Sequence, residues 1–253
     1  MTRTVPHIQV PADVERVVAR LVAAGHEAYV VGGCVRDALR GVDPHDWDIA
    51  TSATPDEIQK VFRHALYLNR FGTVVVRQGD HEIEVTTYRV EADYADHRHP
   101  DTVAFTDSLH EDLSRRDFTM NAMAWRPGVE GRPGELVDPF GGQRDLEARV
   151  VRAVGEPRER FAEDALRMLR AVRFATRLGF VIDPRTADAI RDSASLAASL
   201  SGERIQQEIT KMLEAPKPSE AFRLLSDLGL LAVICVSHLD MARAGPSRRG
   251  IRD

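Results

Sequence analysis

The sequence has few cysteines and few aromatic residues, and it lacks long hydrophobic runs. Its 253 residues include two cysteines, Cys34 and Cys235, which lie far apart and lack the spacing of metal ligands. This usage is typical of a reducing compartment and argues against a disulfide framework. The apolar run 228–236 is too short to span a bilayer, and residues 1–11 lack the apolar core of a signal peptide. We therefore expect a soluble, cytoplasmic protein with no membrane partner.

Positive charge is not in excess either. The formal net charge is −5 and the isoelectric point is about 6.0. A nucleic-acid partner would therefore need a local basic surface. No internal repeat is evident in the sequence. The length allows one large domain or two modest ones, and we expect two.

The stretch 28–51 opens with a pattern that suits a polyphosphate. An apolar run meets Gly32 and Gly33, and a short helix follows. Glycines let backbone N–H groups approach an anion closely, and Arg36 lies one turn into the helix. Taken alone, such a glycine pair is more often only a turn.

The same stretch continues with Asp46 and Asp48, separated by Trp47. Alternation along a strand would put both carboxylates on one face. Two hard oxygen ligands suit Mg²⁺, which binds through one or two carboxylates plus substrate phosphates. An isolated Asp-x-Asp is more often a solvated strand face, but its place shortly after the glycine turn favours one shared site.

A third carboxylate is available on a predicted hairpin. Residues 73–77 and 81–88 are rich in β-forming side chains and are separated by a turn sequence. Glu84 lies in the second strand and could join Asp46 and Asp48 if the hairpin packs beside their strand. A solvated strand face is an equally good interpretation of the pattern alone.

Two further segments connect these elements to the rest of the chain. Residues 90–101 are polar and charged without periodicity, which predicts a mobile loop. The loop histidines His97 and His99 are better explained as solvated side chains than as metal ligands.

A helix capped at Asp107 or Ser108 is predicted to contain residues 111–122. Within it, the adjacent arginines before Asp117, the second of which is Arg116, form a plausible anion clamp. A salt-bridged helix face is the alternative.

The pattern changes from mixed to helical after a strand predicted at 150–154. That strand is expected to close the first domain. The predicted divisions are a mixed first domain (1–154), a helical second domain (155–237) and a polar, disordered tail (238–253).

The first long helix of the second domain is predicted at about 158–178. One side is apolar and the other carries a charged stripe that includes Asp164, Arg167, Arg170 and Arg173. Such a stripe is usually only solvated, but this mixture of acids and arginines could read a base. Further helices are predicted near 184–193, 202–214 and 219–228.

Motifs along most of the chain resemble the class II tRNA nucleotidyltransferase and bacterial poly(A) polymerase family, within the polymerase β-like nucleotidyltransferase superfamily. The glycine-turn and Asp-x-Asp stretch is followed, in the family's order, by FGTVVV, EVTTYR, DLSRRDFTMNAMA, DPFGGQRDL, RFAEDALRMLRAVRFA and SGERIQQEI. The likeness covers roughly residues 28–232. It implies an α+β fold, in which a nucleotidyltransferase head with a mixed β-sheet flanked by helices precedes an all-α neck.

The resemblance also implies a role for individual residues in the head. Asp46 and Asp48 would bind two Mg²⁺ ions, with Glu84 as the supporting carboxylate. The nucleotide triphosphate would be held by Gly32, Gly33 and Arg36. Arg116 would contact the nucleotide, and Asp117 would reach its ribose.

In the neck, Arg170 and Arg173 would complete a clamp that binds the anionic triphosphate. Asp164 and Arg167 would select the base. A carboxylate accepts from the exocyclic amine of cytosine or adenine, whereas uracil and guanine present a carbonyl there. Because an unpaired buried polar group costs about 1–3 kcal/mol, one Asp–Arg pair could admit CTP and ATP and exclude UTP and GTP.

The resemblance therefore predicts a template-independent enzyme that builds the 3′-terminal CCA of tRNA from CTP and ATP with Mg²⁺, releasing pyrophosphate. Alternatives within the family are a poly(A) polymerase or an enzyme that adds only CC or only A. An alternative of another class is a non-catalytic remnant that binds nucleotide or RNA, because family members usually continue beyond the neck into regions that grip tRNA.

Overall fold

The computed structural model describes residues 8–69, 72–92, 102–128 and 133–243. The chain divides into two compact units. The first holds the described residues up to Ala148 together with Arg152–Gly155, and the second holds Arg149–Val151 and the described residues from Glu156 onward. Among the described residues, none of the helices combines the length and the apolar character needed to cross a bilayer.

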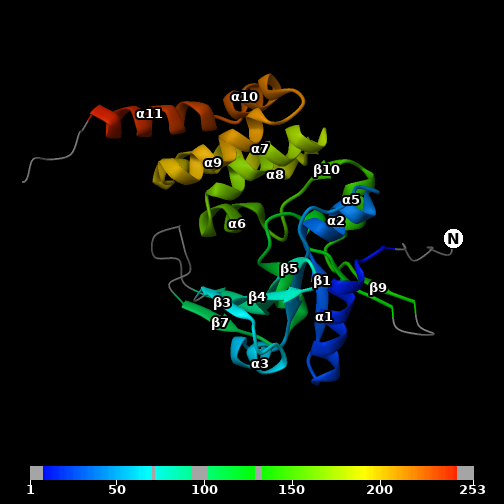
Figure 1. Cartoon of the computed structure of the whole chain (residues 1–253). Coiled ribbons are helices and arrows are strands. Elements are labelled where there is room, and N and C mark those ends of the chain that lie inside the picture. Colours follow the sequence, from blue (N-terminus) through cyan, green and yellow to red (C-terminus); the bar gives the residue numbers. More distant parts are fainter. Residues whose placement is uncertain (1–7, 70–71, 93–101, 129–132, 244–253) are drawn as a thin grey trace, which may run out of the picture. The chain divides into compact units, whose positions relative to one another are not determined.

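The first unit is built on a seven-stranded sheet in the order β3-β4-β5-β2-β1-β8-β9 (Figure 1). Its strands are β1 (Ala28–Val31), β2 (Asp48–Thr51), β3 (Leu66–Asn69), β4 (Thr73–Gln78), β5 (His81–Thr87), β8 (Ala124–Arg126) and β9 (Glu135–Val137). β2 and β5 run parallel, whereas the other neighbouring pairs run antiparallel. The sheet is therefore mixed, and the predicted α+β class is confirmed.

Helices flank this sheet. They are α1 (Ala12–Ala23), α2 (Gly33–Leu39), α3 (Pro55–Val61), α4 (Leu109–Ser114), α5 (Gly142–Glu147) and the 3₁₀ turn η1 (Thr119–Asn121). The capping box that opens α3 forms as its sequence indicates, with reciprocal bonds between Thr54 and Glu57. α1 packs on β1 and β4 through its buried valines and Leu21, although Val22, which the periodicity places on the same face, is 49 % exposed.

The predicted helix through residues 111–122 is broken. α4 ends at Ser114, and the chain is extended at Phe118 before η1 begins. The Asp117 carboxylate accepts a hydrogen bond from the Phe118 N–H at 2.8 Å, and the Phe118 ring is fully buried. This local bond competes with the helical ladder, and tertiary burial of the ring overrides helical periodicity.

The predicted loop at 90–101 is partly a strand. β6 (Arg89–Ala92) pairs antiparallel with β7 (Thr102–Phe105), so residues 90–92 belong to a two-stranded sheet. His97 and His99 lie outside the described residues.

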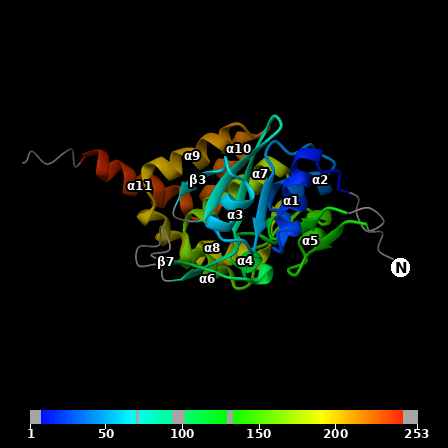
Figure 2. The same ribbon diagram turned by 60° about the horizontal axis from the view of Figure 1, so that its bottom comes forward.

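The second unit is mostly helical. Its helices are α6 (Pro157–Glu163), α7 (Leu166–Leu178), α8 (Pro184–Ser193), the 3₁₀ helix η2 (Ala194–Ser199), α9 (Gly202–Leu213), α10 (Pro218–Asp227) and α11 (Leu230–Arg243). α7 packs against α9 and α10 (Figure 2). α11 packs on η2 and α10. α11 thus continues through 238–243, where the sequence predicted a disordered tail.

Two details of the second unit differ from expectation. β10 (Val150–Val151) pairs in parallel with β11 (Val181–Ile182), so the strand predicted to close the first domain belongs to the helical unit, which is not all-α. The helix predicted at 158–178 is two helices, because Asp164 adopts extended backbone angles, φ −145° and ψ 104°.

Candidate nucleotide-binding and catalytic site

The glycine turn of the first unit lies under two guanidinium groups. Gly32 has φ 80° and ψ −130°, a combination that residues with a side chain rarely adopt. A Cβ atom at Gly32 would lie 2.8 Å from Nη1 of Arg116, and one at Gly33 would lie 3.6 Å from Nη2 of Arg36. Gly32 therefore leaves space for Arg116, whereas Arg36 lies at ordinary contact distance from Gly33. The two positive charges beside the turn favour an anionic ligand.

Arg116 is held by an acid that the sequence analysis did not select. Its Nη2 donates to Asp112 at 3.2 Å, and Asp112 is buried. Burial by itself raises the pKa of Asp112, but Arg116 and Arg115 outweigh this and hold the pKa below its ordinary value. Nε of Arg116 is buried without a hydrogen-bond partner among the described residues. An unpaired buried donor beside the glycine turn fits a bound phosphate oxygen.

The carboxylates Asp48 and Glu84 are direct neighbours across two parallel strands. Asp48 is the first residue of β2 and lies in register with Glu84 of β5. The pKa of Asp48 is raised to about 6, first by burial and then by the negative charges of Glu84 and Asp46, while Arg116 opposes the rise. Negative charge thus accumulates next to the arginine that covers the glycine turn.

Asp46 precedes β2, and its side chain is exposed, unlike that of Asp48. Its side chain is 84 % exposed and contacts His45 at 3.0 Å, an interaction that raises the pKa of that histidine. Trp47 is buried, as the sequence pattern indicates, but the strand begins only at Asp48 and does not include Asp46. Among the residues that the structure describes, no three potential ligands form a ready-made metal cage.

The donor set nevertheless fits a hard divalent cation. Asp48 and Glu84 supply adjacent carboxylate oxygens. The raised pKa of Asp48 reflects its burial first and the negative charge of Glu84 second, and a bound cation would offset both. The exposed Asp46 carboxylate is not locked in a buried contact and could supply further oxygens.

Arg36 and Asp117 are joined through a buried amide. Nη1 of Arg36 donates to Oδ1 of Asn121 at 2.7 Å, and Nδ2 of Asn121 donates to Oδ1 of Asp117 at 3.0 Å. Arg36 also makes two bonds to Asp37, at 2.9 and 2.6 Å. The structure therefore brings together the predicted residues of the glycine turn and the Arg-Arg-Asp motif.

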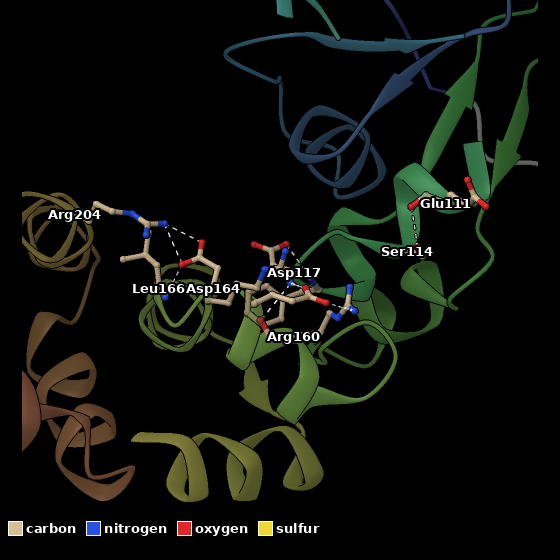
Figure 3. A network of polar contacts seen from close by, with 10 residues as sticks. Glu111, Ser114, Asp117, Arg160, Asp164, Leu166 and Arg204 are labelled. Carbon is tan, nitrogen blue, oxygen red and sulfur yellow. Dashed lines mark hydrogen bonds and ion pairs between the residues drawn. The ribbon is translucent and has the colours of Figure 1, made fainter. Parts of the chain in front are cut away.

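In the second unit, Asp164 ends α6 and starts α7. Its Oδ1 accepts from the Leu166 N–H at 3.0 Å, which caps the new helix. Nη2 of Arg204, from α9, donates to both carboxylate oxygens at 2.8 and 3.1 Å (Figure 3). Nη1 of Arg204 is buried without a partner among the described residues. The carboxylate is thus held from a second helix, beside an unused donor.

Arg167, the second residue of α7, contacts the last turn of α6. Its Nη1 donates to Glu163 at 2.6 Å and to the Arg160 carbonyl oxygen at 3.3 Å. The two side chains predicted to select the base are therefore positioned by different partners, Arg204 and Glu163.

The predicted clamp residues Arg170 and Arg173 have different surroundings. Arg173 is buried, and its Nε donates to the equally buried Glu208 at 2.6 Å. Its guanidinium also lies 4.1 Å from the centre of the Phe174 ring, whereas that of Arg170 lies 5.4 Å away. Arg173 is thus part of the packing of the helical unit, and Arg170 is the more exposed of the two.

Sequence reasoning missed several of the partners that hold these residues. They are Asp112, Asn121, Glu163, Arg204 and Glu208. The four-residue spacing of Asp112 to Arg116 and of Glu163 to Arg167 is a helical ion-pair signal that could have found two of them. The other three make contacts between segments far apart in the sequence.

The fold and these motifs have known counterparts. Residues 28–152 match the poly A polymerase head domain, and residues 179–239 match the domain described as the probable RNA and SrmB-binding site of polymerase A. Residues 28–152 belong to the poly A polymerase head-domain family. The resemblance to class II tRNA nucleotidyltransferases and bacterial poly(A) polymerases is thereby confirmed, and the first unit is the nucleotidyltransferase head.

Two curated proteins with similar sequences are CCA-adding enzymes. A CCA-adding enzyme of Geobacillus sp. (strain WCH70) is 49 % identical over 81 % of this chain and 50 % of its own length. A CCA-adding enzyme of Limosilactobacillus reuteri (strain DSM 20016) is 47 % identical over 83 % of this chain and 52 % of its own. The chain thus spans about half the length of the curated relatives it matches.

Solved structures agree with this grouping. The CCA-adding enzyme of Bacillus stearothermophilus in complex with CTP has a TM-score of 0.77 and 42 % identity, covering 86 % of this chain and 52 % of that one. A tRNA nucleotidyltransferase complexed with a primer tRNA and an incoming ATP analogue has a TM-score of 0.72 and 33 % identity, over 86 % and 62 %.

Proposed function

We propose that this chain is the catalytic head and neck of a tRNA nucleotidyltransferase that adds or repairs the 3′-terminal CCA from CTP and ATP. The observation that carries the proposal is the pairing of Asp48 with Glu84 beside Arg116, which covers the Gly32 turn. The similarity to CCA-adding enzymes solved with CTP or with tRNA supports this choice of substrates.

The triphosphate binds at the glycine turn in this proposal. The guanidinium groups of Arg116 and Arg36 lie beside Gly32 and Gly33, and the unpaired Nε of Arg116 donates to a phosphate oxygen. Asp117 faces the ribose. Because these donors are already in place before the ligand arrives, little ordering is needed on binding.

The carboxylates Asp46 and Asp48, supported by Glu84, hold two Mg²⁺ ions. Bound Mg²⁺ would make the primer hydroxyl a better nucleophile and offset charge on the triphosphate. The 3′-hydroxyl of the tRNA attacks the α-phosphorus in line and pyrophosphate leaves, with no covalent protein intermediate. The buried Cys34, whose pKa is raised to about 11 by burial, is accordingly not a nucleophile.

The base is selected in the neck. The Asp164 carboxylate accepts from the exocyclic amine of cytosine or adenine, and Arg167 donates to a ring acceptor. Arg204 and Glu163 keep these two side chains in place. Arg170 contributes positive charge for the phosphates, and Arg173 assists it through the packing of the same helix.

The test is incorporation of each labelled nucleotide, with Mg²⁺, onto tRNA transcripts ending at the discriminator base, at C and at CC. Ordered addition of C, C and A that then stops is the expected result. Long A tails would instead identify a poly(A) polymerase, and addition of only CC or only A a partial enzyme. Nucleotide binding without incorporation would leave a non-catalytic remnant. Asp48→Asn should abolish incorporation, and unchanged incorporation would refute the assignment of the carboxylates.

A further inference from the structure

Asn121 connects two sequence motifs of the head, the glycine turn with Arg36 and the Arg-Arg-Asp motif with Asp117. It lies at the end of η1 and is 7 % exposed. Its Oδ1 accepts from Arg36, next to the glycine turn, at 2.7 Å, and its Nδ2 donates to Asp117 at 3.0 Å. One buried side chain therefore contacts both a guanidinium and a carboxylate.

The chemistry of these neighbours leaves little freedom at this position. A guanidinium only donates and an ionised carboxylate only accepts, so the bridging group must accept at one end and donate at the other. A carboxamide does both, and its two neighbours fix which way it points. An aspartate of the same shape could accept from Arg36 but would repel Asp117. A leucine of similar size could form a hydrogen bond with neither.

The bridge is anchored in the core of the head. The Thr119 hydroxyl donates to the buried Asp145 at 2.8 Å, and the Thr119 N–H donates to the Arg152 carbonyl oxygen at 2.9 Å. Nε of Arg152 in turn donates to Asp145 at 2.9 Å. Because η1 is held at its start, Asn121 is a fixed reference point for the side chains that it contacts.

We infer that Asn121 is a positioning residue that fixes Arg36 and Asp117 relative to each other, and so couples recognition of the triphosphate to recognition of the ribose. This inference rests on the proposed function, in which Arg36 serves the phosphates and Asp117 the ribose. Asn121 itself touches neither part of the nucleotide. Its effect is to keep both contacts at the separation that one ribonucleotide spans.

Two substitutions separate the halves of the bridge. Asn121→Asp keeps an oxygen toward Arg36 and places a second oxygen against Asp117, so only the ribose side is disturbed. Asn121→Leu removes both bonds at nearly constant volume. Gln59→Leu is the matched control, because it exchanges an exposed amide of the same unit for leucine. Thermal unfolding of each variant reports whether it folds.

The measurement is calorimetric titration of the full chain with ATP, dATP and AMP in the presence of Mg²⁺. For Asn121→Asp we expect the preference for ATP over dATP to fall toward 1, while the preference for ATP over AMP stays within about threefold of the wild-type value. For Asn121→Leu we expect both preferences to fall, by about tenfold where the wild-type value allows it, as expected for lost bonds to charged groups. Gln59→Leu should match the wild type.

Several results would overturn the inference. One is an Asn121→Leu variant that keeps both preferences, and another is equal weakening of all three ligands by both variants, which is the signature of a merely structural role. A wild type that binds ATP and dATP equally would also overturn it, by removing the ribose role of Asp117. A wild type that binds no nucleotide would instead refute the proposed function, so the two failures are distinguishable.

Discussion

When no divalent metal is present, the Asp48 carboxylate should lower the free energy of unfolding of the head more at neutral pH than in mild acid. Its folded-state pKa is about 6, against an ordinary value of 3.8. A carboxyl group whose pKa is raised on folding binds more protons in the folded state than in the unfolded state. Its destabilising effect is therefore absent below the unfolded-state pKa and grows as the pH rises to the folded-state pKa. The substitution that exposes this cost is Asp48→Asn, which keeps the shape and removes the charge.

The size of the effect follows from the two pKa values. The rise in the pKa of Asp48 from 3.8 to about 6 corresponds to about 3 kcal/mol at pH 7. The same linkage gives ~1.5 kcal/mol at pH 5 and ~0.5 kcal/mol at pH 4. We therefore expect Asp48→Asn to exceed the wild type in free energy of unfolding by up to about 3 kcal/mol at pH 7, with most of the difference lost by pH 4.

The assay is urea unfolding of the two proteins in chelator across this pH range. Glu82→Gln is the control, because it neutralises an exposed carboxylate of the neighbouring strand β5 and should show no comparable pH dependence. Added Mg²⁺ at pH 7 should stabilise the wild type more than Asp48→Asn. A stability difference that stays constant from pH 7 to pH 4, or grows on acidification, would refute the reasoning.

Three further predictions concern other residues of the two units. Gly32→Ala should weaken ATP binding at least tenfold because its methyl group would displace Arg116. Gly41→Ala, which also has a positive φ (71° against 80°) but open space around it, should leave binding unchanged in the same titration. Arg204→Met should release the Asp164 carboxylate and lower the discrimination against UTP and GTP by ~1–2 kcal/mol, so that more of both is incorporated. Arg191→Met, on the exposed side of α8, should leave this discrimination unchanged. Glu208→Leu should lower the free energy of unfolding by about 3 kcal/mol, because the buried Arg173 would lose the charge of the Glu208 carboxylate. A loss below ~1 kcal/mol in chemical denaturation would contradict this account.

Local patterns predicted the parts of the site that depend on neighbouring residues. The turn at Gly32 and the hairpin that carries Glu84 each follow from a few adjacent residues. The sequence could not show that Glu84 lies beside Asp48. Strand periodicity indicates which side chains share a face, but it does not indicate which strands are neighbours in the sheet. The parallel register of β2 and β5 places the two residues side by side.

The remaining features depend on contacts between distant segments. Apolar residues continue at helical spacing on both sides of Asp164, so periodicity joined α6 and α7 into one helix. What separates them is the extended backbone of Asp164, together with its bonds to Leu166 and Arg204. Arg204 lies forty residues along the chain, and its role cannot be read from spacing. Likewise β3 and the pairing of β10 with β11 rest on tertiary neighbours rather than on strong local signals.

The motif residues of both units are held by a similar arrangement. Arg116 is paired with Asp112, Arg36 with Asp37, and Asp164 with Arg204, each at least partly buried. A charged side chain that already has a partner loses little conformational freedom when a ligand arrives, and its position is defined before binding. The unpaired donors on Arg116 and Arg204 then point to where the ligand's acceptors belong. Selectivity in this family should accordingly depend as much on the partners that fix the motif residues as on the motif residues themselves.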